Sequence, residues 1–241
     1  MQGLASVTAA VLAGGLGTRL RSIVADRPKV LAEIRGRPFL AYLLDQLAAA
    51  GVRNVVLCTG YLGEQVQAVF GDSYGDLRLA YSQESAALGT AGALRLALPL
   101  LKSDVVLVMN GDSYCQADLG AFWIWHCERG AAATLLLTKV PDTTRYGQVQ
   151  VENNGQVRSF VEKGKASGPG WINAGIYLLR RDLLQTIPIR RAVSIEREMF
   201  PAWVGQGLYG YPSEGQFIDI GTPESYALAE QFFATRSDYD H

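Results

Sequence analysis

The sequence predicts an α/β fold in which a mixed, mostly parallel sheet is flanked by helices and followed by a smaller β-rich lobe. In the first half, short apolar runs alternate with amphipathic segments, and this βαβ rhythm is typical of parallel sheets covered on both faces. In the second half, Asn153-Asn154-Gly155 separates two alternating segments, which is the pattern of a β-hairpin. The predicted arrangement is Rossmann-like.

Seven segments of the first half fit this rhythm. Leucines recur at helical spacing along residues 39–50 and give that segment one apolar face. Ligands of such sheets bind beyond the carboxyl ends of the strands, so the loops after Ala13, Tyr81 and Met109 are the ones to examine. The expected strands are 7–13, 55–59, 77–81 and 105–109, and the expected helices are 39–50, 63–70 and 91–98.

The second half is expected to supply three strands and two helices. Thr222 and Pro223 are suited to the N-cap and the first position of the last helix. No repeat or low-complexity segment interrupts the chain, so we predict a single domain over residues 1–241, with halves 1–130 and 131–241. The expected strands are 147–151, 157–161 and 172–179, and the expected helices are 194–203 and 223–233.

Composition excludes several classes of protein. The formal net charge is −1, which gives no general attraction to nucleic acid or to an acidic membrane. The three cysteines have no metal-ligand spacing and fit a reducing compartment. The apolar run 7–13 lacks the basic flank of a signal peptide, and no segment approaches membrane-spanning length. We therefore expect a cytoplasmic protein.

A glycine-rich loop follows the first predicted strand. Gly14, Gly15 and Gly17 let backbone N–H groups converge on phosphate oxygens, and Arg19 can grip a phosphate with two N–H donors. The loop lacks the Gly-Lys-Ser/Thr of a Walker A motif, and Leu20 stands where a dinucleotide fingerprint has its third glycine. Taken alone, the loop fits a tight strand-to-helix turn equally well.

The glycine loop is the first of several motifs that occur in a fixed order. With these motifs the chain resembles the sugar-nucleotide pyrophosphorylases, the sugar-1-phosphate nucleotidyltransferase family, over nearly its whole length. After Leu12-Ala13-Gly14-Gly15-Leu16-Gly17-Thr18-Arg19 and Pro28-Lys29 come Leu88-Gly89-Thr90-Ala91-Gly92-Ala93-Leu94, Asn110-Gly111-Asp112, Tyr146-Gly147, Phe160-Val161-Glu162-Lys163, Asn173-Ala174-Gly175-Ile176-Tyr177 and Phe217-Ile218-Asp219-Ile220-Gly221-Thr222-Pro223.

The resemblance implies an enzyme in which a sugar phosphate attacks the α-phosphorus of a nucleoside triphosphate and pyrophosphate leaves. It implies a nucleotide-binding half, 1–130, and a sugar-binding half, 131–241. Two polyanions must meet, so cations and orientation matter more than a nucleophilic side chain. The implied catalytic residues are Arg19 on the β- and γ-phosphates, Lys29 near the α-phosphate, Lys163 on the sugar phosphate, and Asp112. The alternative for each cation alone is a solvated surface position.

The remaining implied contacts lie in the loops after predicted strands. A carboxylate such as Glu84 would suit guanine, although Ala86-Ala87 stands where family members often have an acidic residue and proline. The implied sugar-phosphate contacts are Gly111, Tyr146, Gly147, Glu162, Lys163, Asn173 and Ala174. The implied nucleotide contacts are Leu12, Ala13, Gly14, Gly15, Gly17, Thr18, Arg19, Lys29, Gln83, Glu84, Gly89, Thr90 and Asp112.

Two aspartates, one from each half, form a candidate metal site. Asp112 follows an apolar strand at the edge where ligands bind, and Asp219 lies near the end of the chain. Mg²⁺ commonly takes one or two protein carboxylates and completes its shell with phosphate and water oxygens. The resemblance assigns both aspartates to Mg²⁺ between the two phosphates. The alternative for Asp112 is a turn or helix cap.

The aromatic residues and the histidine are expected to be structural. Trp123, Trp125, Trp171 and Tyr177 are more typical of core or lobe packing than of sugar platforms. His126 is expected on the surface of a helix. No Ser/His/Asp triad or catalytic cysteine is indicated.

Some segments narrow the subfamily. Leu16-Gly17-Thr18-Arg19-Leu20-Arg21-Ser22 and Pro38-Phe39-Leu40-Ala41-Tyr42-Leu43 look most like D-glycero-α-D-manno-heptose 1-phosphate guanylyltransferases. That resemblance implies GTP as donor and GDP-heptose for cell-surface glycans. Small-molecule substrates, with neither nucleic acid nor membrane, are the expected partners, and a homo-oligomer stays open.

Four alternatives are weighed against this resemblance. A hexose enzyme would use mannose, glucose or N-acetylmuramate 1-phosphate with GTP, dTTP, UTP or CTP. A non-catalytic sugar-nucleotide-binding regulator would not need the intact charged motifs. A dinucleotide oxidoreductase is disfavoured by Leu20, and the Asp-x-Asp motif of glycosyltransferases is lacking at Asp112-Ser113-Tyr114.

Overall fold

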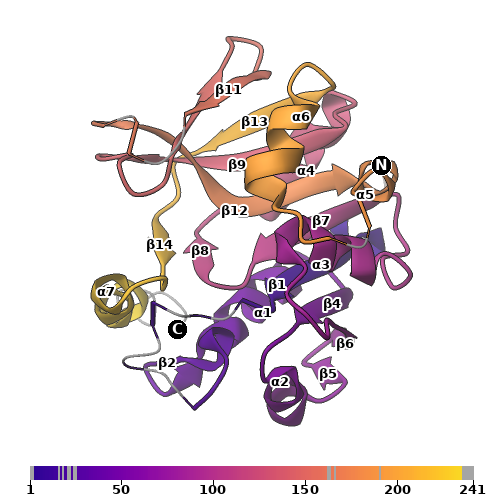
Figure 1. Ribbon diagram of the computed structural model, residues 1–241, viewed down its shortest axis with the longest axis vertical. Helices are drawn as coiled ribbons and strands as arrows, with labels where there is room; N and C mark the ends of the chain where they lie inside the picture. Colours follow the sequence, from indigo (N-terminus) through magenta and orange to yellow (C-terminus); the bar gives the residue numbers. More distant parts are fainter. Residues whose placement is uncertain are drawn as a thin grey trace.

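The protein is built around an eight-stranded sheet. The computed structural model describes residues 3–15, 17, 19–20, 23, 26–161, 164–165, 167–189 and 191–234. The strand order is β13-β9-β12-β7-β1-β4-β6-β5, and helices pack on both faces (Figure 1). Three two-stranded sheets, β10-β11, β14-β8 and β2-β3, complete the described β-structure.

The first half forms the parallel part of this sheet, as predicted. Each predicted element is present, and its ends differ from the prediction by two residues or fewer. The parallel strands are β1 (Thr8–Ala13), β4 (Asn54–Thr59), β6 (Leu77–Gln83) and β7 (Val105–Asn110). The helices between them are α1 (Phe39–Ala49), α2 (Gly63–Phe70) and α3 (Gly89–Ala97), and the short elements are η1 (Leu4–Ser6), η2 (Lys29–Leu31), β2 (Glu33–Ile34), β3 (Arg37–Pro38) and β5 (Ser73–Tyr74).

The second half is less separate from the sheet than the sequence suggested. Its strands β9 (Ala133–Val140), β12 (Gly170–Arg180) and β13 (Leu208–Ser213) extend the central sheet beyond β7. β12 runs antiparallel to both β7 and β9, which makes the sheet mixed. The predicted hairpin, β10 (Gln148–Val151) and β11 (Val157–Val161), lies outside that sheet.

Sequence patterns missed several elements around position 120 and beyond. Helix α4 (Leu119–Glu128) is apolar on several sides, so it lacks the helical periodicity that identifies a surface helix. The short apolar stretch of β9, Leu135–Leu137 between two buried threonines, lacks a period-2 alternation and does not distinguish a strand from a buried helix. The other missed elements are β8 (Ser113–Cys115), α5 (Arg181–Gln185), β13 and β14 (Phe217–Asp219).

The predicted helix over 194–203 consists of two pieces, a π-helical turn (Ile195–Met199) and α6 (Phe200–Trp203). The last helix, α7 (Pro223–Ala234), begins as predicted. Thr222 and Ser225 cap it reciprocally, because Ser225 N donates to Thr222 Oγ1 at 3.3 Å and Thr222 N donates to Ser225 Oγ at 3.2 Å.

Two hydrophobic cores lie on opposite faces of the sheet. Successive side chains of β1 alternate between them, with Ala9 and Val11 in one cluster and Ala10 in the other. Residues of α1, α2, α4 and α7 belong to the first cluster, and residues of α3, α5 and α6 belong to the second. Tyr177 is fully buried in the second cluster, as predicted.

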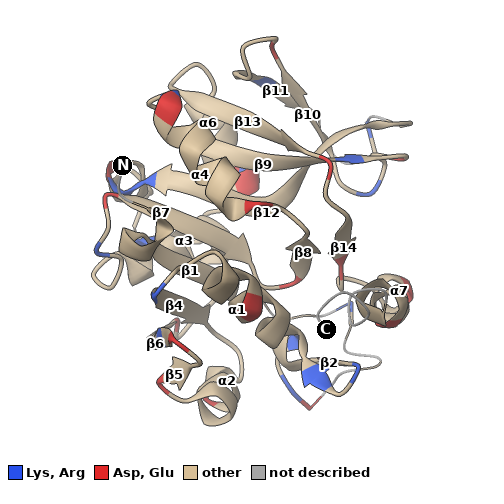
Figure 2. Cartoon of the chain, turned by 180° about the vertical axis from the view of Figure 1, so that it is seen from behind, with Lys and Arg blue, Asp and Glu red and all other residues tan. Residues whose placement is uncertain are grey.

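Many of the charged residues stand in loops and at the ends of elements (Figure 2). In the described part of the chain, no helix combines the length and apolar character that a membrane crossing requires.

The prediction for His126 is wrong. Its side chain is 2% exposed, and Nδ1 lies 2.7 Å from Thr134 Oγ1 on β9. The apolar environment and then the nearby charge of Arg180 lower the pKa of His126 to about 4. The imidazole is therefore neutral at physiological pH and forms part of the contact between α4 and the sheet.

The buried imidazole makes the fold sensitive to acid. The unfolded chain takes up a proton at His126 near pH 6.5, whereas the folded chain does so only near pH 4. The contribution of His126 to the free energy of unfolding is therefore fully present above pH 6.5. It decreases as the pH falls to 4, by up to about 3 kcal/mol. Urea unfolding of wild type and His126→Gln across this range measures the difference. A difference that does not change with pH would contradict the assignment.

Candidate active site

The strand order reverses at the boundary between β1 and β7. Chain connections from β1 lead outward through β4 and β6, and the chain then returns to place β7 on the other side of β1. Ligands of open α/β sheets bind outside the carboxyl ends of the strands at such a switch point. A pocket of about 160 Å³ lies there, lined by Leu12, Ala13, Gly15, Gly17, Arg19, Lys29, Val30, Gly111, Asp112 and Gly221.

Gly111 brings the loop after β7 against the end of β1. Its N–H donates to Leu12 O at 2.9 Å. A Cβ at this position would lie 2.5 Å from the same oxygen and 2.9 Å from Val30 Cγ1, so only glycine fits without displacement. The close approach places the next residue, Asp112, at the mouth of the pocket.

Lys29 and Asp112 form an ion pair across this pocket. Lys29 Nζ lies 2.8 Å from Asp112 Oδ2, and the side chains are 11% and 45% exposed, respectively. Pro28 precedes the short helical turn that begins at Lys29. Gly17, with φ +58°, packs close to the lysine stem, because a Cβ on it would lie 3.3 Å from Lys29 Cβ. The lysine is therefore enclosed, and its charge is matched by one carboxylate.

The start of α7 reaches the same pocket from the end of the chain. A Cβ at Gly221 would lie 2.6 Å from Asp219 Oδ1, 3.5 Å from Arg19 Nη2 and 3.6 Å from Lys29 Nζ. Two cations and a carboxylate thus converge around one backbone position. Arg19, Lys29, Asp112 and Asp219 were each selected from the sequence, and the structure brings all four together.

Strand pairing joins the two aspartates. β14 runs antiparallel to β8 with Asp219 opposite Ser113, and Ile220 N donates to Asp112 O at 2.9 Å. The carboxylates therefore come from adjacent backbone segments, although more than one hundred positions separate them in the numbering.

Neutral donors hold Asp219 at both oxygens. Tyr146 OH donates to Oδ2 at 2.6 Å, and Gly221 N and Ser225 Oγ donate to Oδ1 at 2.9 Å and 3.4 Å. Burial and then the hydrogen bond to this carboxylate raise the pKa of Tyr146 to about 12, so the phenol stays protonated. Ser225 was not identified from the sequence, in which it stands three residues after Thr222.

Glu84, at the end of β6, faces the glycine loop. Its Oε1 would lie 3.0 Å from a Cβ on Gly14 and 2.9 Å from one on Gly60, and its Oε2 accepts from Leu88 N at 3.0 Å. Burial raises the pKa of this carboxyl group above its usual range. Gly60 was not identified from the sequence, where it reads as an ordinary turn residue.

Other predicted nucleotide contacts are differently placed. Thr90 Oγ1 donates to Glu196 Oε2 at 2.8 Å and accepts from Ile195 N at 2.8 Å, so it joins α3 to the π-helical turn. Gly89 packs against the same segment, because a Cβ on it would lie 2.5 Å from Val193 O. Gln83 is exposed. Thr18 lies outside the described residues.

The predicted sugar-phosphate contacts are only partly described. Asn173 Nδ2 donates to Tyr177 OH at 2.9 Å and Asn173 Oδ1 accepts from Gly175 N at 2.8 Å, so its amide supports an irregular part of β12. Ala174 is buried, and Gly147 has φ +74°. Glu162 and Lys163 lie outside the described residues. The roles of all these residues stay predictions.

The chain matches the family model described as "Nucleotidyl transferase" over residues 8–236. It is 38% identical to a mannose-1-phosphate guanylyltransferase of Mycobacterium tuberculosis over 91% of this chain and 62% of that protein. It therefore spans less than two thirds of the length of that relative. It is 35% identical to the D-glycero-alpha-D-manno-heptose 1-phosphate guanylyltransferase of Aneurinibacillus thermoaerophilus over 92% of this chain and 96% of that protein.

A solved structure covers the chain equally well. The crystal structure of HddC from Yersinia pseudotuberculosis matches with a TM-score of 0.84 and 32% identity, over 94% of this chain and 99% of that one. The same protein complexed with GMP-PN matches with a TM-score of 0.82. With the match across residues 8–236 and the charged pocket at the strand switch, the chain belongs to the nucleotidyl transferase family.

Proposed function

We propose that this chain is an enzyme that transfers the guanylyl group of GTP to D-glycero-α-D-manno-heptose 1-phosphate, giving GDP-heptose and pyrophosphate. The observation that supports it most is the convergence of Arg19, Lys29 and Asp219 around Gly221, beside the Lys29–Asp112 ion pair. We assign residues 1–130 to the nucleotide and residues 131–241 to the sugar phosphate. We place the reaction in the cytoplasm, where nucleotide sugars for surface glycans would be made.

The transfer needs no nucleophilic side chain. An oxygen of the sugar phosphate forms a bond to the α-phosphorus, and the bond from that phosphorus to the bridging oxygen of the β-phosphate breaks. The leaving pyrophosphate carries the electron pair away. Repulsion between the two anions is the main barrier that the protein can lower, and fixed cations in a partly enclosed pocket do so without reorganisation.

Lys29 is suited to the α-phosphate and Arg19 to the β- and γ-phosphates. The ammonium group of Lys29 pairs with the Asp112 carboxylate. An oxygen of the α-phosphate would compete with that carboxylate for the ammonium group. Arg19 is exposed at the entrance and can bind two phosphate oxygens with its planar donor fork. Lys163 is proposed for the sugar phosphate on the resemblance alone.

The carboxylates suit a magnesium ion. Asp112 and Asp219 are hard oxygen donors on adjacent backbone segments, and Oδ1 of Asp112 accepts no hydrogen bond from any described residue. Mg²⁺ commonly takes one or two protein carboxylates and most of its other ligands from substrate and water. Bound Mg²⁺ would neutralise phosphate charge and polarise the reacting phosphoryl group.

Glu84 is the proposed reader of guanine. Guanine presents two adjacent donors, N1–H and N2–H, which an ionised carboxylate can accept together. Adenine, uracil and thymine lack this pair. The Glu84 carboxylate lies beside Gly14 and Gly60, at the ends of β1 and β4, where a base next to the glycine loop would lie.

The choice of sugar follows from the lengths and identities of two relatives. The heptose enzyme of Aneurinibacillus thermoaerophilus is covered almost end to end, which favours heptose 1-phosphate. The higher identity to the mannose enzyme keeps mannose 1-phosphate as the second candidate. A purely regulatory binder is disfavoured because it would not need Lys29, Arg19 and both aspartates at one pocket.

Pyrophosphate release tests the function directly. The purified chain is incubated with Mg²⁺, each of five nucleoside triphosphates (GTP, ATP, UTP, CTP and dTTP), and heptose, mannose, glucose or N-acetylmuramate 1-phosphate. We expect the highest kcat/KM with GTP and heptose 1-phosphate. Turnover with a hexose 1-phosphate only would overturn the sugar assignment, and tight binding of nucleotide sugars without turnover would support the regulatory alternative.

Replacing Asp112 tests the cation site. Asp112→Asn keeps the shape but removes the charge that both Lys29 and a metal require, so we expect kcat to fall about 1000-fold, or about 4 kcal/mol of transition-state stabilisation. Asp118→Asn is the matched control, since Asp118 caps α4 through Ala121 N and asparagine also caps helices. An Asp112→Asn rate near that of wild type would remove Asp112 from the mechanism.

Replacing Glu84 tests base selection. Glu84→Gln should weaken GTP binding about 10- to 100-fold, because it loses two hydrogen bonds to an ionised acceptor. Glu64→Gln, on the exposed face of α2, should change nothing. In wild type the KM for GTP should rise as the pH falls through the raised pKa of Glu84, and this rise should be absent from the variant. Equal GTP affinity in both proteins would exclude Glu84 as the base reader.

A further inference from the structure

The Tyr146 hydroxyl binds Asp219, one of the two candidate metal-ligating aspartates. The sequence led us to expect this tyrosine among the sugar-phosphate contacts. In the structure its hydroxyl donates its one hydrogen to Asp219 Oδ2 at 2.6 Å. This is the shortest of the three hydrogen bonds that Asp219 accepts from described residues.

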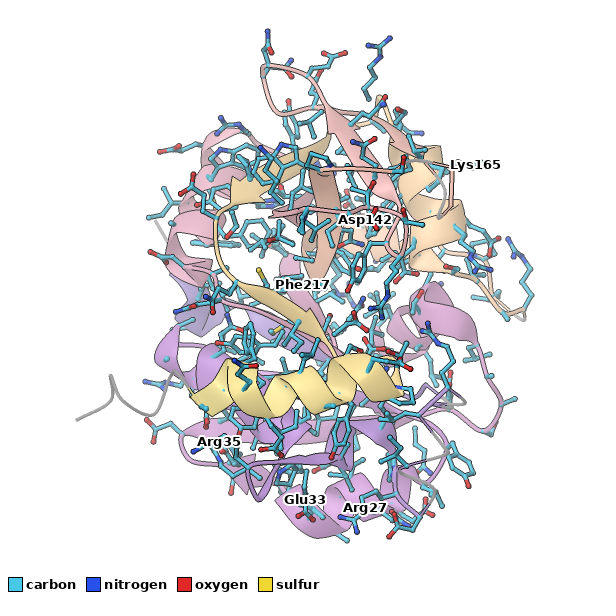
Figure 3. All side chains as sticks on the ribbon, turned by 90° about the vertical axis from the view of Figure 1, so that its left-hand side faces the viewer. Arg27, Glu33, Arg35, Asp142, Lys165 and Phe217 are labelled. Carbon is cyan, nitrogen blue, oxygen red and sulfur yellow. The ribbon has the colours of Figure 1, made fainter. Side chains whose placement is uncertain are left out.

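The tyrosine ring is fixed against the strand that carries Asp219. Phe217 and Asp219 stand two positions apart on β14, so their side chains leave the strand on the same side. The Tyr146 ring packs edge-to-face on Phe217, with centroids 5.6 Å apart and an interplanar angle of 82°. Figure 3 shows Phe217 on the strand that leads into α7. Ring and hydroxyl therefore contact alternate residues of one short strand.

The backbone of Tyr146 is anchored independently of β14. Tyr146 N donates to Thr143 O at 3.0 Å, and Thr143 N donates to Gly168 O at 3.0 Å. Thr143 is buried, and its hydroxyl also donates to Gly168 O at 3.2 Å. The loop thus has its own supports, and the phenol oxygen is positioned by them before it meets the carboxylate.

The two aspartates are held in different ways. Asp112 is neutralised by Lys29, whereas Asp219 has only neutral donors among the described residues and no ion pair there. Neutral donors orient the Asp219 carboxylate without cancelling its negative charge, so that charge can attract a cation.

We propose that Tyr146 is a positioning residue of the divalent-cation site, where its hydroxyl orients the Asp219 carboxylate. The inference rests on the proposed function, because it takes Asp219 as a ligand of the cation. Groups that hydrogen-bond to a metal ligand set its orientation, and their removal commonly lowers metal affinity. Tyr146 thereby connects the loop at residues 143–147 to the cation on which nucleotide binding depends.

The test is Tyr146→Phe, which keeps the ring on Phe217 and removes only the donor. Mn²⁺ binding is titrated by electron paramagnetic resonance, first with Mn²⁺ alone and then with the α,β-methylene analogue of GTP, whose α–β bridge cannot be cleaved. We expect the variant to bind Mn²⁺ about tenfold or more weakly than wild type. At saturating Mn²⁺ the KM for the sugar phosphate should equal that of wild type.

Two variants calibrate the measurement. Asp219→Asn should abolish the Mn²⁺ signal that this site produces, and Tyr81→Phe, which removes a hydroxyl that donates to Gly71 O and does not line the pocket, should leave it unchanged. Wild-type Mn²⁺ affinity in Tyr146→Phe would overturn the inference, as would a raised KM for the sugar phosphate with Mn²⁺ affinity unchanged. Mn²⁺ binding through Asp219 without guanylyl transfer by wild type would instead refute the proposed function and leave the inference standing.

Discussion

The ion pair between Lys29 and Asp112 sets the character of this site. A largely enclosed ammonium group requires a counter-charge, and Asp112 supplies it at 2.8 Å. The charge of Lys29 is thus matched within the protein, while its ammonium group lies where an anionic substrate would arrive. Gly17 gives the lysine stem room, and Gly111 lets the aspartate approach the end of β1. Both glycines therefore allow Lys29 and Asp112 to form this ion pair.

The pocket also depends on contacts between distant parts of the chain. β8 follows β7 directly, and β14 precedes α7, yet the two strands pair. That pairing brings Asp219 beside the Asp112 segment and leads Gly221 to the cations. This short antiparallel pairing adds the carboxylate of Asp219 to the Lys29–Asp112 pair of the first half. The site therefore depends on the pairing of β8 with β14 as well as on the glycine loop.

Much of the fold could be predicted from local pattern. The first-half strands and helices alternate clearly and end at recognisable turns, so their bounds were nearly correct. α4 and β9 were missed because neither has a one-sided apolar pattern. His126 was misplaced for the same reason: on a helix with apolar residues on several sides, no sequence signal tells a buried histidine from an exposed one. The burial of these elements and of His126 depends on tertiary packing, which the local sequence does not show.

The charged members of the site were also predictable, but their mutual arrangement was not. Motif order identified Arg19, Lys29, Asp112 and Asp219. The Tyr146–Asp219 hydrogen bond spans 73 positions and depends on strand pairing that no local pattern reveals.

The placement of β12 has a consequence for synthesis of the chain. β7 ends at Asn110, whereas its outer neighbour β12 is complete only at Arg180. Until the ribosome has released that later segment, one whole side of β7 has unpaired N–H and C=O groups. Open strand edges attract other chains, so the nascent first half is the stage most exposed to aggregation and to capture by chaperones. Slow elongation between these two strands would prolong that exposure.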